Sequence, residues 1–143
     1  MKNLYAVWDS ISTWTWEILQ TIVGLFVILI YGAKFYTRLG KRYIFTSKRM
    51  PGGISLGAFI VLNSYYEKDP VTQHHEYGHT RQSMILGPLY LFTVGICSIL
   101  NAAFDFTSYY YDFWTEKWAD RLGGITREGG KHHRRVTRDT MVW

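Results

Sequence analysis

The sequence predicts a mainly α membrane protein that also contains a short β-strand or hairpin. Three observations lead to this fold class. The chain of 143 residues is 48% hydrophobic and only 19% charged. Two long stretches, residues 18–33 and 82–104, contain no charged side chain. Between them lies a pair of histidines spaced for one face of a helix. The length allows one domain, residues 1–143, with a small core.

Composition also excludes several classes of protein. The high apolar content and the scarcity of charge exclude an intrinsically disordered chain. The single cysteine, Cys97, excludes a disulfide scaffold and a cysteine-rich zinc module. The net charge of +5 suits anionic lipid or nucleic acid. Because the basic residues adjoin an apolar stretch, lipid is the expected partner and nucleic acid is not.

We expect an N-terminal transmembrane helix within residues 1–36. The uncharged stretch is slightly short of a hydrocarbon core of roughly 30 Å. Trp14 and Trp16 before it and Tyr31 and Tyr36 after it form the aromatic flanks that a span would have. The alternative is a helix buried in a protein core, which so small a chain is poorly able to cover.

The charges around this helix predict its orientation. Basic residues follow it without an acid among them: Lys34, Arg38, Lys41, Arg42, Lys48 and Arg49. The positive-inside rule therefore places the amino terminus outside and residues 34–70 in the cytoplasm.

Residues 54–63 are expected to form a β-strand. The stretch is rich in apolar and β-branched residues, with Gly52-Gly53 before it and a turn at residues 67–70 after it. Its suggested partner is the segment Tyr43–Thr46.

The helix expected next contains the strongest chemical signal of the chain. Asp69-Pro70 offers a helix start, and the helix can continue to Leu86. His75 and His79 share one face of it and can bind one metal ion. Glu76 lies just off that face, where it can accept a proton from a water that zinc makes acidic. The alternative is a surface helix with histidines by chance.

A catalytic zinc site needs a third protein ligand. Glu116 and Asp120 are four residues apart, on one face of an expected helix. Glu116 could complete the site, and Asp120 could orient a histidine ligand. Alternatively, both carboxylates belong to a solvated helix face, with Lys117 and Arg121 nearby. Cys97, inside an apolar block, is an unfavourable ligand.

Together these residues resemble a known group. The pattern His-Glu-x-x-His followed by Glu-x-x-Ala-Asp-x-x-Gly is similar to the gluzincin metallopeptidases, especially the branch containing the CAAX prenyl endopeptidases and bacterial heat-shock membrane endopeptidases. The resemblance implies that His75, His79 and Glu116 bind zinc, that Glu76 is the general base and that Asp120 supports a ligand. It also implies an active site on the cytoplasmic side of a bacterial inner membrane.

The resemblance leaves the group that stabilises the oxyanion open. The candidates are His132, His133 and Tyr110, with Arg127, Tyr109 and Tyr111 also considered.

If His75 and Glu116 share one zinc ion, residues 85–113 must leave and return on one side of the membrane. Each arm of this segment has about 14 residues and reaches roughly 20 Å, which is too short to span. We therefore expect a re-entrant or shallow hairpin that turns at Gly95 or Asn101, with a bend near Gly87. The catalytic core then covers residues 37–126, and 127–143 form a basic, loosely held tail.

The leading hypothesis is a zinc-dependent membrane endopeptidase acting on peptide or protein substrates near the membrane surface. By resemblance, the strand at 54–63 binds substrate as an added strand. Two alternatives stay open: a zinc-binding, non-proteolytic membrane scaffold or adaptor, and a basic lipid- or nucleic-acid-binding membrane protein.

Overall fold

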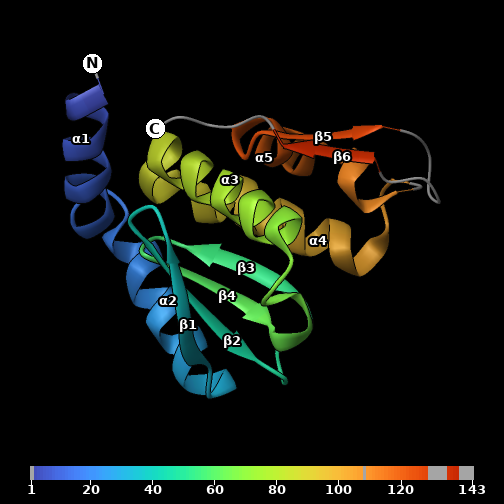
Figure 1. Ribbon diagram of the computed structural model, residues 1–143, viewed down its shortest axis with the longest axis horizontal. Coiled ribbons are helices and arrows are strands. Elements are labelled where there is room, and N and C mark those ends of the chain that lie inside the picture. Colours follow the sequence, from blue (N-terminus) through green and yellow to red (C-terminus); the bar gives the residue numbers. More distant parts are fainter. Residues whose placement is uncertain (1, 108, 129–134, 139–143) are drawn as a thin grey trace.

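The computed structural model describes residues 2–107, 109–128 and 135–138. The protein is mostly helical, with a small mixed sheet (Figure 1). The main elements are α1 (Lys2–Trp14), α2 (Ile18–Tyr31), β1 (Lys34–Leu39), β2 (Arg42–Ser47), β3 (Gly53–Leu56), β4 (Phe59–Asn63), α3 (Pro70–Leu86), α4 (Ile96–Phe104), α5 (Trp114–Leu122), β5 (Ile125–Glu128) and β6 (Arg135–Arg138).

The single helix expected within residues 1–36 is instead two helices followed by a strand. The segments Val7–Trp14 and Ile18–Tyr31 are bent by 69° relative to each other, and β1 already begins at Lys34. Among the described residues no single helix is both long and apolar enough to cross a membrane, although two bent pairs of helices meet that test together. Gly32, in the left-handed region with φ of 57°, ends α2.

A buried ion cluster holds the break between α1 and α2. The Arg42 guanidinium of β2 is 1% exposed and pairs with Asp9 at 2.8 Å and Glu17 at 3.1 Å. It also donates to Thr13 Oγ1 at 2.6 Å and to the Gly57 carbonyl at 3.0 Å. A buried charge is tolerated only when it is paired and hydrogen-bonded, so α1, the break and β2 are fixed together.

The sheet has the order β1-β2-β4-β3, with β2 and β4 parallel and the other pairs antiparallel. The expected pairing of residues 43–46 is confirmed, since Tyr43 to Ser47 align with Phe59 to Asn63. The prediction of a single strand at residues 54–63 was wrong, because β3 and β4 form a hairpin there. Gly57, with φ of 56°, makes the turn, and a side chain there would overlap Thr21.

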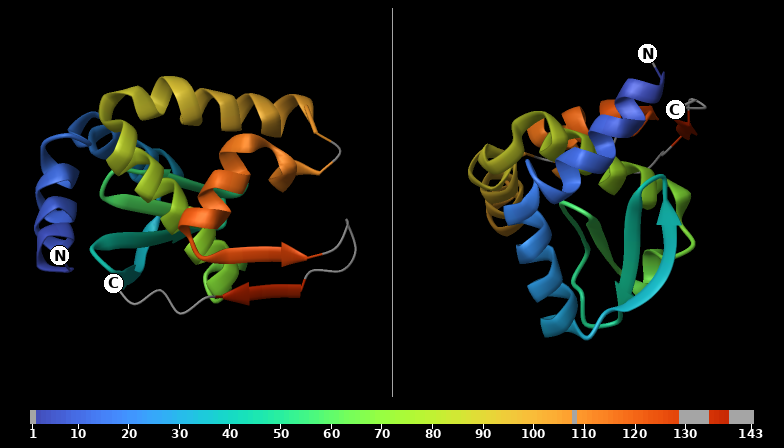
Figure 2. Two further views of the ribbon diagram at one scale, coloured as in Figure 1. Left: turned by 90° about the horizontal axis from the view of Figure 1, so that it is seen from above. Right: turned by 90° about the vertical axis from the view of Figure 1, so that its left-hand side faces the viewer.

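One helix packs on each face of the sheet, α2 on one and α3 on the other (Figures 1 and 2). Side chains of successive β4 residues point to opposite faces of the sheet, as expected for a strand. Ile60 and Leu62 pack in a cluster with Tyr77 of α3, whereas Val61 packs in a cluster with Ile28 of α2.

Helix α3 begins and ends where the sequence indicates. Asp69 caps it, because its carboxylate accepts from the Val71 backbone N–H at 3.0 Å. The expected bend near Gly87 is confirmed: the helical segments Pro70–Leu89 and Leu91–Phe104 meet at 114°.

The chain turns back later than expected. Gly95 and Asn101 both lie within helical structure, and the reversal follows Phe104 at Asp105, whose φ is 48°. Asn101 instead supports the returning segment, since its side-chain amide donates to the Tyr110 carbonyl at 3.2 Å.

The returning chain packs α5 against α3. Gly78 of α3 allows the close approach, because a methyl group at this position would overlap the Ala119 carbonyl of α5. Beyond α5, part of the expected loose tail is ordered: β5 and β6 pair as an antiparallel hairpin. The remainder of residues 127–143 lies outside the described residues.

We predict that Gly78→Ala destabilises the protein even though alanine favours a helix by about 1 kcal/mol. Overlap with α5 should outweigh that gain, for a net loss of roughly 1–2 kcal/mol. The control is Gly52→Ala, where no atom lies within 4 Å of the added methyl group. Thermal unfolding in detergent measures both; equal melting temperatures would show that α3 and α5 do not meet this closely.

Candidate metal centre

Helices α3 and α5 bring His75, His79 and Glu116 into one buried cluster. Each of the three residues offers one ligand atom, and these atoms lie within 4.8 Å of one another. His75 Nε2 is 3.1 Å and His79 Nε2 is 3.2 Å from Glu116 Oε2. The structure therefore brings together the three residues that the sequence indicates as ligands.

A carboxylate orients the first histidine. His75 Nδ1 lies 2.7 Å from Asp120 Oδ1. Asp120 in turn accepts two hydrogen bonds from the Arg127 guanidinium, at 2.6 and 3.0 Å. The Arg127 guanidinium also lies 3.6 Å from the ring centre of Tyr111, whose ring meets that of His75 edge to face. This arrangement holds Asp120 and directs His75 Nε2 toward Glu116.

An amide orients the second histidine. His79 Nδ1 lies 2.7 Å from Gln82 Oε1, and the Gln82 amide nitrogen donates to the Thr115 carbonyl at 2.7 Å. When each Nδ1–H donates to its oxygen partner, each Nε2 has a free lone pair. Both imidazoles then present a ligand atom to the same point.

The Glu116 side chain is fully buried and is held from the opposite side. Thr115 Oγ1 is 3.1 Å from Glu116 Oε1, and Ser98 Oγ of α4 donates to Thr115 Oγ1 at 2.9 Å. Burial and the charge of the nearby Glu116 carboxylate raise the pKa of Tyr110 well above its usual range. Glu116 Oε2 remains directed at the histidines.

Glu76 faces the outer strand β3. Its Oε2 accepts a hydrogen bond from Ser55 Oγ at 2.7 Å, and the Ser55 carbonyl accepts one from the Tyr90 hydroxyl at 3.2 Å. Gly53 leaves room for the other carboxylate oxygen, because an added methyl group would overlap Glu76 Oε1. The carboxylate therefore lies between α3 and the sheet edge.

Without a metal ion the cluster is a network of ion pairs. Burial alone would lower the pKa of His75, but hydrogen bonds to Asp120 and Glu116 raise that pKa to about 9. Burial would raise the pKa of Glu116, but hydrogen bonds from His75 and His79 lower it well below its usual range. The pKa of Asp120 is also lowered, because His75 and Arg127 outweigh its burial. A metal ion would compete with protons for the imidazoles.

Several parts of this site were not expected from the sequence. Gln82 follows His79 by three residues, a helical spacing that could have indicated it. Arg127 was considered only as an oxyanion group, whereas here it pairs with Asp120. Ser55 and Ser98 carry no sequence signal of a role. The oxyanion candidates His132 and His133 lie outside the described residues.

Comparison with known proteins does not assign this site. No protein-family model, no curated protein and no solved structure matches the chain.

We predict that Asp120→Ala weakens zinc binding about 10- to 100-fold, because His75 loses the partner that orients it. Titration of the metal-free protein with zinc, with a competing chelator, measures the change. Asp112→Asn is the control, since this exposed carboxylate pairs with Lys117 outside the cluster. Equal zinc affinities for the two variants and the wild type would contradict a role of Asp120 at a metal site.

Proposed function

We propose that the protein is a zinc-dependent endopeptidase that hydrolyses peptide bonds near a membrane surface. One observation carries the proposal: a buried group of two imidazoles and one carboxylate adjoins the glutamate that follows the first histidine. The order of His75, Glu76 and His79 along α3, with Glu116 arriving from α5, is the one that the resemblance to gluzincins implies.

The donor set fits zinc. Two imidazole nitrogens and one carboxylate oxygen are the protein ligands of many catalytic zinc sites, which keep a further position open for water or substrate. The hydrogen bonds at both Nδ1 atoms supply the support that such ligands need. His75, His79 and Glu116 would hold the ion.

The bound ion would supply Lewis acidity, both to the scissile carbonyl and to the attacking water. The protein then has to move one proton. Glu76 takes it from the water on its carboxylate and delivers it to the leaving amine. The hydrogen bond from Ser55 fixes one Glu76 oxygen, and the other packs against Gly53, where a side chain would overlap it.

The substrate would be an extended peptide lying along β3. This strand is at the edge of the sheet, paired with β4 on one side, and it carries Ser55 beside Glu76. Main-chain hydrogen bonds to an edge strand bind a peptide independently of most of its side chains. The resemblance to gluzincins implies substrate binding by the segment 54–63, and within that segment we assign it to β3.

Tyr110 is the candidate for stabilising the oxyanion among the described residues. The charge of Glu116 contributes to its raised pKa, which indicates that Tyr110 lies near the ligand cluster. Arg127 has a different role in this scheme, because both of its hydrogen bonds to Asp120 serve to position that residue.

A non-proteolytic zinc-binding scaffold or adaptor would use the same three ligands. A scaffold would have no need of a carboxylate beside these ligands. Substitution of Glu76 therefore distinguishes the two functions.

We predict that Glu76→Gln retains one zinc ion per chain but loses peptide hydrolysis by at least about 100-fold, because the proton acceptor is gone. Detergent-purified, tag-free protein is assayed by metal analysis and by mass spectrometry of a mixed peptide library. Asp112→Asn should match the wild type in both measurements.

Three further results would decide against the proposal. Hydrolysis unchanged in Glu76→Gln would refute the assigned base. Zinc bound equally by wild type and Glu116→Ala would remove the third ligand. Tight zinc binding without hydrolysis of any library peptide by the wild type would favour the scaffold.

A further inference from the structure

The outer side of α2 is an exposed apolar stripe. The sheet covers the inner side, where Gln20, Thr21, Gly24 and Ile28 are buried. The exposed side chains recur at the helical spacings of three and four residues, and Ile30 reaches 70% exposure. They are Ile18, Leu19, Ile22, Leu25, Phe26, Leu29 and Ile30.

The segment from the end of α3 through α4 carries a second stripe of the same kind. Its inner side holds Val94 and Asn101, both buried, and Ser98, which donates to Thr115 beside Glu116. Its outer side consists of large apolar residues that are 39–67% exposed. They are Ile85, Leu89, Phe92, Ile96, Ile99, Leu100 and Phe104.

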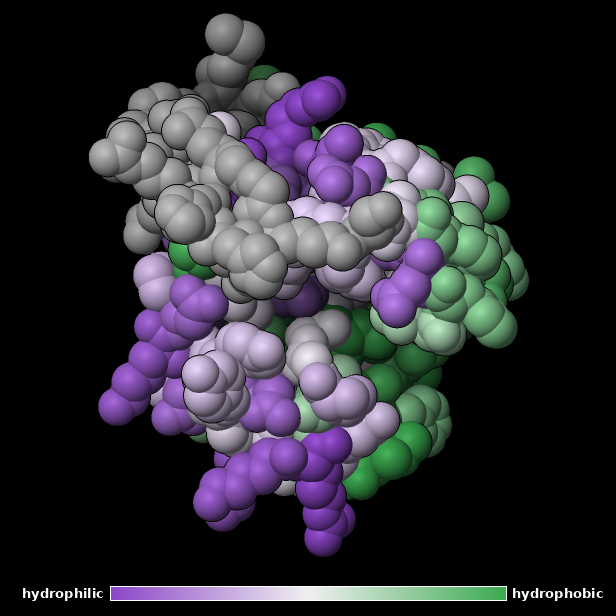
Figure 3. Space-filling model, turned by 90° about the vertical axis from the view of Figure 1, so that its right-hand side faces the viewer, coloured by the Kyte–Doolittle hydropathy of each residue, from purple (hydrophilic) through white to green (hydrophobic). Residues whose placement is uncertain are grey.

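The two stripes lie on the same side of the protein. Both views of Figure 2 place α2 and α4 on the side that is farthest from the viewer in Figure 1. Figure 3 shows hydrophobic residues gathered along that side, with strongly hydrophilic residues elsewhere on the surface. Helix α2 meets the end of α3 at Gly87, whose carbonyl accepts from the Gln20 side chain and whose Cα packs against Trp16.

We infer that the stripes of α2 and α4 form one lipid-binding surface, the apolar face, and that this face inserts into a single leaflet of an anionic bilayer without α2 crossing it. The inference goes beyond the proposed hydrolysis and does not depend on the metal centre. It replaces the two-sided topology expected from the positive-inside rule with one in which both ends of α2 stay on one side.

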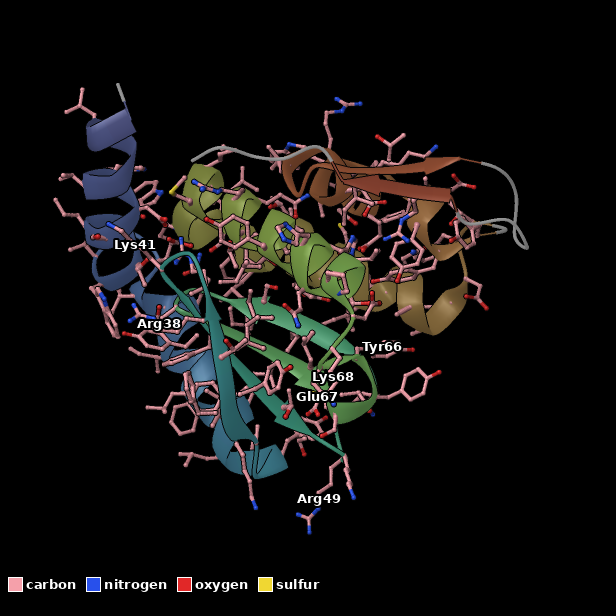
Figure 4. The ribbon with its side chains drawn as sticks, in the orientation of Figure 1. Arg38, Lys41, Arg49, Tyr66, Glu67 and Lys68 are labelled. Atoms are coloured by element: carbon pink, nitrogen blue, oxygen red, sulfur yellow. The ribbon has the colours of Figure 1, made fainter. Side chains whose placement is uncertain are left out.

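The position of the sheet is the reason that α2 does not cross. The sheet runs alongside α2, with Lys41 beside α1 at one end and Arg49 at the other (Figure 4). Arg42 pairs with Asp9, which joins the chain after α2 to the chain before it. A crossing α2 would carry the open edge of β1, including Arg38, into hydrocarbon, where unpaired backbone groups have no partner.

Charge and aromatic content favour lipid over a protein partner. Neither residues 18–33 nor 82–104 contain a charged side chain. Exposed Trp14 and Trp16 adjoin the start of α2, where amphipathic rings suit the headgroup region. Exposed basic residues follow α2 at Lys34, Arg38, Lys48 and Arg49, and they complement anionic headgroups.

The apolar face would also set where the metal centre lies. On α4, Ser98 points toward Thr115 and the ligand cluster, while Ile96 and Ile99 point outward. The cluster is therefore one helix away from the lipid surface, on the side occupied by α3, α5 and the sheet.

Vesicle flotation tests the surface. Detergent-purified protein is diluted onto preformed vesicles of phosphatidylethanolamine and phosphatidylglycerol. Wild type should float with them, and Phe26→Glu combined with Phe92→Glu should bind at least about tenfold less. Tyr65→Glu is the control, because this side chain is 85% exposed on another element and should leave flotation unchanged. Equal flotation of all three proteins would overturn the inference. So would a soluble wild-type dimer that does not float, since it would assign the face to a second copy.

Cysteine labelling tests the topology. In a Cys97→Ala background, Ser10→Cys lies before α2 and Lys48→Cys lies after it, both at exposed positions. A membrane-impermeant maleimide added outside the vesicles should label both variants fully. Labelling of only one of them until the vesicles are lysed would show that α2 crosses, and would overturn insertion into one leaflet. Neither readout uses hydrolysis, so failure here is distinct from failure of the proposed function.

Discussion

The close approach of α3 and α5 is the contact on which the rest of the structure depends. Gly78 permits it, because a methyl group there would overlap the Ala119 carbonyl. This contact places Glu116 at 3.1–3.2 Å from the Nε2 atoms of two histidines that are distant in sequence. The glycine costs helix propensity within α3, but it gives the chain a buried site that neither helix could form alone. Because α5 must pack against α3, the chain that leaves α3 through α4 has to turn back toward α3.

Two buried clusters of ionisable residues, one around Arg42 and one around His75 and His79, connect separate parts of the fold. Around Arg42, two carboxylates and a hydroxyl contact the guanidinium and fix α1 and the start of α2 to the sheet. Around the histidines, hydrogen bonds from His75 to Asp120 and Glu116 outweigh its burial and raise the pKa of His75 to about 9. In the histidine cluster a divalent cation could replace the protons that balance the negative charge of the carboxylates. Hydrogen bonds at the two Nδ1 atoms already direct both Nε2 atoms to one point.

Local signals in the sequence predict local structure well. The Asp69-Pro70 start of α3, the bend at Gly87 and the pairing of residues 43–46 with the later strand were all correct. The break after α1 was missed, because it is held by Arg42, whose partners Asp9 and Glu17 lie 33 and 25 residues away in the sequence. The two histidine ligands could be predicted from the sequence, because their spacing of four residues places His75 and His79 on one face of a helix. The roles of Ser55 and Ser98 were not, because they arise from contacts 21 and 17 residues apart that no local pattern encodes.

We propose that two imidazoles and one carboxylate bind one zinc ion between α3 and α5. X-ray absorption spectroscopy of the zinc-loaded wild type tests it most directly, because the spectrum identifies the ligand atoms. We expect nitrogen and oxygen ligands at about 2.0–2.2 Å, with an imidazole pattern for two histidines and no sulfur. Sulfur at about 2.3 Å would assign the metal to Cys97, and a spectrum without imidazole would contradict the site altogether.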